Sequence, residues 1–139
     1  MTVITLREQH PTDTGFAAEL IFDGRSRYPI TLTDPFSPAQ ERRLEWYFEK
    51  WLVFPQWDER KAQDAKASVG EYGEALFAQV FKSHFDAYSE YRQIRGNLGN
   101  VRIEIEGNTP EFQALHWEAL KDPDLPRPLA VDCVMLRKS

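Results

Sequence analysis

The sequence predicts a mixed α/β fold in a single domain or in a fragment of one, and three observations carry this prediction. Residues 1–36 contain three short segments in which apolar and polar residues alternate, as they do in half-buried strands. Residues 37–99 carry apolar residues at the three-four spacing of helices. Residues 100–139 present a strand, a helix start and a second strand, which is the order of a parallel α/β unit.

The first third predicts an antiparallel β-meander. Its strands are expected at Val3–Arg7, Phe16–Phe22 and Tyr28–Thr33. The Asp-Gly pair at 23–24 is a strong hairpin turn, because glycine tolerates positive φ. Pro29 cannot donate a ladder hydrogen bond, so the third strand is expected at an edge of the sheet.

The middle third predicts a helical pair. Ser37 can cap the first helix, with Pro38 at its first position and Gln40 reaching back as in a capping box. Its apolar face would comprise Leu44, Tyr47, Phe48, Trp51 and Leu52, before a break at 54–57.

A longer helix is expected from about Asp64 to about Ile94, followed by a glycine-rich turn at 96–100. Gly70 and Gly73 lie inside its apolar pattern, where each costs about 1 kcal/mol relative to alanine. Close approach to another backbone is the expected reason for both glycines.

The last third begins with the alternating strand Val101–Glu106. Thr109 is positioned to cap a helix whose first residue is Pro110. The apolar run Leu129–Leu136 predicts a buried strand. A parallel sheet does not normally end after one crossover, so the chain is expected to be the front part of something larger.

The composition disfavours several classes of partner. A formal net charge of -5 and a pI near 5.2 argue against a nucleic-acid backbone binder and against a polybasic membrane anchor. No segment approaches the roughly 18 to 20 apolar residues that cross a bilayer. A single cysteine and the lack of a signal-like N-terminus predict a cytoplasmic protein. Its expected partners are other protein segments.

Few residues offer catalytic chemistry. Cys133 is the only thiol, with His10, His84 and His116 as possible bases, but its apolar surroundings predict a buried structural thiol. A small cysteine enzyme that uses Cys133 is the competing hypothesis. The histidines and carboxylates do not have the spacing of a metal site, so no metal is expected. The sequence also lacks a glycine-rich phosphate-binding loop, so no cofactor is expected.

Among the carboxylates of the last third, Glu111, Glu118 and Asp122 have no spacing that forces a catalytic pair. Carboxylates on a helix are usually solvated. Glu118 is the expected exception, because it follows Trp117 in a segment that must pack on the sheet. We expect it to be partly buried and to accept structural hydrogen bonds.

Several segments together resemble a known family. They are the strand 101–105, the helix 110–120 with its Trp117-Glu118 pair, the Asp122-Pro123 turn and the strand 129–131. This order resembles the opening of the CHAT domain, a caspase-like domain that occurs in bacteria beside tetratricopeptide repeats. Segments 44–55 and 69–81 are similar to the helices before its core, so the resemblance covers about residues 37–136. His116 departs from it, because the family usually has proline there.

The resemblance implies that the parent protein is a cysteine endopeptidase with a histidine-cysteine dyad. The family's histidine precedes a glycine, a pair that this sequence lacks, and Cys133 falls too early to be the nucleophile. No catalytic residue is therefore assigned. Trp117, Glu118, Asp122 and Pro123 are interpreted as a structural motif beside the sheet.

The resulting hypothesis is the N-terminal part of a CHAT-type protein, non-catalytic by itself, whose protein partner is the rest of the caspase-like domain. The alternative is a stand-alone protein–protein interaction module that pairs with a partner chain through an exposed strand edge.

Overall fold

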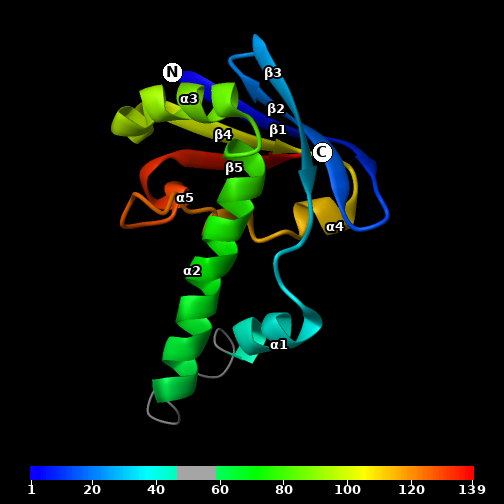
Figure 1. Ribbon diagram of the computed structural model, residues 1–139, viewed down its shortest axis with the longest axis vertical. Helices are drawn as coiled ribbons and strands as arrows, with labels where there is room; N and C mark the ends of the chain where they lie inside the picture. The colour runs from blue at the N-terminus through cyan, green and yellow to red at the C-terminus, as the bar shows by residue number, and fades with distance from the viewer. Residues whose placement is uncertain (47–58) are drawn as a thin grey trace.

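The computed structural model describes residues 1–46 and 59–139 and contains a five-stranded mixed sheet in the order β3-β2-β1-β4-β5. The long helix α2 extends from this sheet, with α1 beside its far half (Figure 1). In chain order the elements are β1 (Thr2–Pro11), β2 (Phe16–Phe22), β3 (Ser26–Leu32), α1 (Pro38–Trp46), α2 (Glu59–Phe81), α3 (Phe85–Ile94), η2 (Arg95–Asn100), β4 (Val101–Glu106), α4 (Pro110–Gln113), η3 (Trp117–Ala119), α5 (Leu129–Asp132) and β5 (Val134–Lys138).

The predicted meander is confirmed. β1 pairs antiparallel with β2, and β2 pairs antiparallel with β3. Asp23 and Gly24 have φ values of 52° and 70°, the positive values that tight hairpin turns favour, and the Arg25 amide donates to the Phe22 carbonyl across the turn at 2.9 Å. Pro29 lies on β3, the edge strand, where its missing N–H breaks no ladder.

The second half of the sheet is parallel. β4 lies beside β1 in register from Thr2–Val101 to Arg7–Glu106, and β5 lies beside β4. Both crossovers therefore step in the same direction across the sheet. Because parallel crossovers are right-handed, both connections fall on the same face. The mixed α/β class is as predicted, and the meander and the final unit form one sheet.

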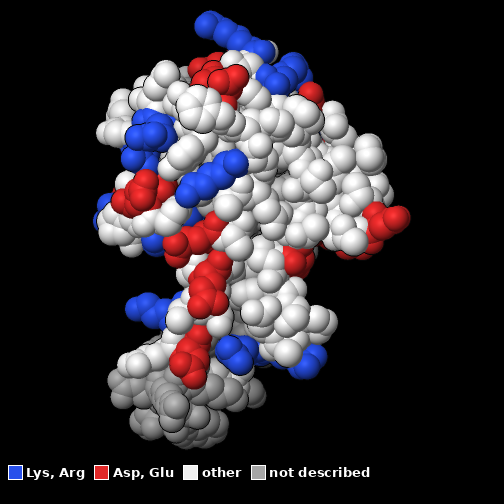
Figure 2. Space-filling view, in the orientation of Figure 1, with Lys and Arg blue, Asp and Glu red and all other residues white. Residues whose placement is uncertain are grey.

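The hydrophobic core lies on this helix-covered face. Strand residues such as Leu6, Leu20 and Ile103 are buried there against Phe77 and Phe81 of α2. The opposite face carries charged rows instead. Arg7 Nε lies 2.8 Å from the Glu106 carboxylate, and other ion pairs flank this one. Away from the sheet, the outer surface of α2 is acidic: Figure 2 shows a row of acidic side chains along this helix, whose exposed residues include Asp64 and Glu71.

The predicted helix of residues 64–94 is wrong in one respect, because the chain bends after α2. His84 is extended, with φ -130° and ψ 130°, and α3 starts at the next residue. The bend returns α3 to the sheet edge, where Glu90 accepts hydrogen bonds from Ser26 and Tyr28. It also brings Tyr91 to within 4.7 Å of Phe81 between ring centroids, which one straight helix would not do.

The start of α1 is confirmed as a capping box. The Ser37 amide donates to Gln40 Oε1 at 2.8 Å, and the Gln40 amide donates to Ser37 Oγ at 3.3 Å. The predicted apolar face beyond Trp46 and the break at 54–57 lie outside the described residues. No helix in the described ranges has the length and apolarity needed to cross a bilayer.

The crossover between β4 and β5 is less helical than predicted. α4 has only four residues, and His116, with φ -79° and ψ 68°, leaves the helical conformation instead of continuing it. Thr109 makes no side-chain cap. Its amide and that of Asn108 donate to Glu8 Oε1 at 3.1 Å each, so a carboxylate from β1 binds these amides.

The predicted buried strand Leu129–Leu136 is also wrong in extent. Its first four residues form the single turn α5, which buries Leu129 and leaves Val131 61% exposed. Only Val134 onward pairs with β4, and Val134 and Leu136 are 48% and 40% exposed. The run is apolar because it supplies one turn and an edge strand. It is not a strand buried on both sides.

The two glycines of α2 provide a matched test of backbone approach. A Cβ on Gly73 would lie 1.8 Å from the Ala119 carbonyl oxygen, whereas a Cβ on Gly70 would meet nothing within 4 Å. The prediction of close approach is therefore confirmed for Gly73 and wrong for Gly70. We expect Gly73→Ala to lower the free energy of unfolding by about 1–3 kcal/mol, because η3 must move away.

Gly70→Ala serves as the control and should raise the free energy of unfolding by about 0.5–1 kcal/mol, through helix propensity alone. Urea unfolding followed by circular dichroism measures both variants. Equal effects of the same sign would contradict the close packing of η3 on α2.

Candidate functional site

The crossover between β4 and β5 is anchored by Trp117, which is fully buried. Its indole Nε1 donates to the Phe112 carbonyl at 3.0 Å, and the two rings lie 5.3 Å apart between centroids. A buried indole N–H needs such an acceptor. Trp117 therefore holds α4 and η3 together as one packed unit on the sheet.

Asp122 is the buried carboxylate of this segment, with no exposed surface. It accepts hydrogen bonds from Tyr91 Oη at 2.7 Å, from the Asp124 amide at 2.8 Å and from Arg95 Nη1 at 3.1 Å. Burial by itself would raise the pKa of Asp122, but these donors outweigh burial and lower it. Asp122 thus joins the crossover to α3, while Pro123 is exposed beside it.

The burial expected for Glu118 falls instead on Asp122. Glu118, predicted to be partly buried, keeps 57% of its side-chain surface exposed. It does accept hydrogen bonds, from the guanidinium of Arg137 on β5. The sequence signal that could have identified Asp122 is its position before proline, where a short polar side chain often binds nearby amides.

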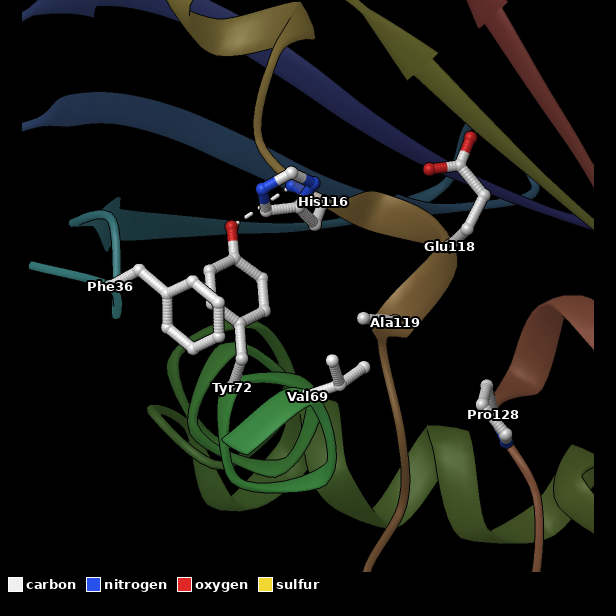
Figure 3. A pocket seen from close by; sticks show the side chains of 7 residues that line it. All are labelled: Phe36, Val69, Tyr72, His116, Glu118, Ala119 and Pro128. Atoms are coloured by element: carbon white, nitrogen blue, oxygen red, sulfur yellow. Dashed lines mark hydrogen bonds between the residues drawn. The ribbon is translucent and has the colours of Figure 1, made fainter. Parts of the chain in front are cut away.

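A pocket of about 310 Å³ lies beside this segment (Figure 3). Tyr72, Phe36 and His116 gather on one side of it, and the Glu118 carboxylate points away from them. The remaining lining residues are Val69, Ala119 and Pro128. The walls are mostly apolar, and no Cys, Ser or Thr is among the lining residues that the structure describes. The pocket is therefore better suited to binding an apolar side chain than to catalysing a reaction.

His116 has a structural explanation at this pocket. Its backbone amide donates to Tyr72 Oη at 2.9 Å, a bond that proline could not make. Its imidazole Nε2 lies 2.7 Å from Glu41 Oε1 of α1. Burial raises the pKa of Tyr72 strongly, so its phenol stays neutral and can accept this amide. His116 therefore links the crossover to both α2 and α1.

A second, polar cleft of about 520 Å³ lies where the parallel strands β1, β4 and β5 end. Its residues come from the carboxyl ends of the three strands and the loop after β4, and include Arg7, His10, Glu106, Asn108 and Lys138. Open α/β sheets bind ligands at this edge, because the loops that follow the strands converge there. The cleft offers charges of both signs but no thiol.

Cys133 lies at the opposite end of the sheet, just before β5 begins. It is buried, and burial, with a smaller contribution from the charge of Asp132, raises the pKa of the thiol to about 11. The three histidines make their hydrogen bonds elsewhere, His10 with Pro11, His84 with Pro29 and His116 with Glu41. This arrangement fits a structural thiol and not a nucleophile.

Within residues 1–46 and 59–139, no three histidine, cysteine or acidic side chains are grouped so as to hold a metal ion. Comparisons of this chain with protein-family models, with curated proteins and with solved structures find no match.

The Asp122 cluster predicts a specific dependence of stability on pH. Because the folded-state pKa of Asp122 is lowered, its carboxylate contributes stability above its unfolded pKa, and this contribution is lost as pH falls through the folded value. Tyr91→Phe should therefore lower the free energy of unfolding at pH 7 by about 1.5–3 kcal/mol, with a smaller loss at pH 3.

Urea unfolding at both pH values measures this difference. Asp124→Asn is the control, because its side chain is 58% exposed and the change should stay within about 0.5 kcal/mol. A Tyr91→Phe variant as stable as the wild type at pH 7 would show that the cluster is not structural.

Proposed function

We propose that this chain is the N-terminal part of a CHAT-type caspase-like protein and cleaves no peptide by itself. One observation supports this most: β4 and β5 are parallel, and the crossover between them carries the buried Trp117 and Asp122. The resemblance to the CHAT domain implies a strand, a tryptophan-containing segment and a second strand in the same order. In this proposal the chain supplies the first part of the sheet on which the parent's active site is built.

The polar cleft is where the proposed parent would act. Strands added beyond β5 in the same direction would end at this edge, next to Lys138 and Glu106. The resemblance implies that later strands carry the histidine and the cysteine. Since none of the cleft residues is a thiol, the chain itself would contribute only binding and positioning groups, such as Arg7 and His10. A free thiol suits the reducing cytoplasm, where we expect the protein to act.

The mass of the natural polypeptide tests this proposal. An antibody raised against residues 1–139 should detect a protein much larger than 16.2 kDa in cell extracts. Mass spectrometry of the captured band should then find, after Leu136, a histidine-glycine segment and a later cysteine. A natural polypeptide of 16.2 kDa would reject the proposal.

Thiol labelling separates this proposal from an independent cysteine enzyme. Iodoacetamide should label native Cys133 slowly at pH 7, because the thiol is buried and its pKa is raised to about 11. The same chain in concentrated urea, where the thiol is accessible, provides the reference rate. Native labelling as fast as the urea rate would favour the enzyme hypothesis.

The second candidate function is a stand-alone interaction module. The exposed side chains of β5 favour it, because an unpaired strand edge can take up a strand from another chain. The same antibody distinguishes the two functions. A 16.2 kDa polypeptide captured in a stable complex with a second protein would support the module instead of the larger parent.

A further inference from the structure

The two edges of the sheet are built differently. β3 has Pro29 near its middle and exposed Arg27 and Thr31 beside it, features that keep edge strands from pairing. β5 has no proline, and two of its exposed residues, Val134 and Leu136, are apolar. A strand at the edge of a sheet leaves one row of its backbone groups without a ladder partner, and β5 pairs only with β4 among the described strands.

The backbone of β5 is available for pairing at alternate residues. The Gly107 amide donates to the Lys138 carbonyl at 3.0 Å, so the peptide groups of Lys138 face β4. Because a strand alternates, those of Leu136 and Val134 face β4 as well. The N–H and C=O groups of Met135 and Arg137 therefore point away from the sheet, toward an added strand.

The side chains of β5 on the open face, which is the face opposite the helices, change in character along the strand. Val134, Leu136 and Lys138 share that face, so the row changes from apolar to basic along β5. Glu104 is nearly buried and lies 2.9 Å from Lys138 Nζ and 2.8 Å from Arg102 Nε. Glu106 also lies beside Lys138 in the register of β4 and β5, and it pairs with Arg7. Two carboxylates thus lie among three cations on this face, and the excess positive charge favours a further carboxylate beside Lys138.

We propose that β5 takes up an extended protein segment as a parallel sixth strand, with two apolar residues beside Val134 and Leu136 and an acidic residue beside Lys138. The inference rests on the proposed function, which makes this segment the next strand of the same polypeptide. The parallel direction continues the pattern of the steps from β1 to β4 and from β4 to β5, which are both parallel and in the same sense across the sheet.

Binding of a synthetic peptide to the 139-residue chain tests the inference. The peptide has the order Thr-Val-Thr-Leu-Thr-Glu-Thr, and a control peptide carries lysine in place of glutamate. Amide chemical shifts in ¹⁵N spectra should change, to saturation, mainly at Met135 and Arg137. The lysine peptide should bind about two- to fivefold more weakly, and Lys138→Gln should remove this difference. Equal affinity of the two peptides for the wild type would overturn the predicted direction and charge.

A pair of variants separates backbone pairing from side-chain contact. Met135→Pro removes the outward N–H and should abolish binding, whereas Met135→Ala shortens the same side chain but keeps the N–H and should retain it. Should Met135→Pro fail to fold, peptides N-methylated on the pairing side replace it and should not bind the wild type. Binding that survives both forms of blocking, or that is lost equally in Met135→Ala, would overturn strand addition.

Two further outcomes are decisive. A dimer of the chain that forms through β5 and excludes the peptide would reject the assignment of this edge to the same polypeptide. The mass test is independent of the peptide test. Peptide binding by a natural 16.2 kDa polypeptide would reject the proposed function and keep the edge site, and a longer polypeptide without peptide binding would do the reverse.

Discussion

The structure depends on the pairing of β1 with β4. This parallel ladder pairs Thr2 with Val101 and Arg7 with Glu106. The rest of the meander and the helices α1 to α3 therefore form the connection between two strands that are neighbours in the sheet. Closing so long a connection has an entropic cost that burial on the helix-covered face must offset. The fully buried aromatic residues Phe77, Phe81 and Tyr91 lie on this connection, where they contribute to that burial. The bend at His84 is needed to bring Tyr91 into the cluster.

The crossover from β4 to β5 solves a different problem, because it contains little regular structure. Its backbone groups are satisfied by specific partners instead of by a helix. Gln113 donates to the carbonyls of Gly107 and Lys138, and the Lys121 amide donates to the Gly73 carbonyl. Trp117 and Asp122 add one buried apolar anchor and one buried polar anchor. Such a segment is held by a few contacts, so single substitutions within it matter more than they would in a long helix.

These features connect to function through the β5 edge and the polar cleft. Pro29 protects the β3 edge, so among the described strands β5 offers the edge at which the proposed sheet would continue. Extension in that direction lengthens the same row of carboxyl ends that forms the cleft. Sheet growth and construction of a reactive site are therefore the same step in the function we propose.

The sequence by itself determined the elements whose cause is local. Alternation specified β2 and β4, the Asp-Gly pair specified its hairpin, and Ser37 with Gln40 specified the start of α1, because each depends on residues that are close in the chain. Tertiary structure decided the rest. The helix break at 82–84 places α3 against the sheet edge. The burial of Asp122 instead of Glu118 is set by Tyr91 of α3 and Arg95 at the start of η2, which are distant from it in the sequence. The exposure of Val134 and Leu136 follows from their place at the end of the sheet, because an apolar run has the same sequence pattern whether its edge is covered or bare.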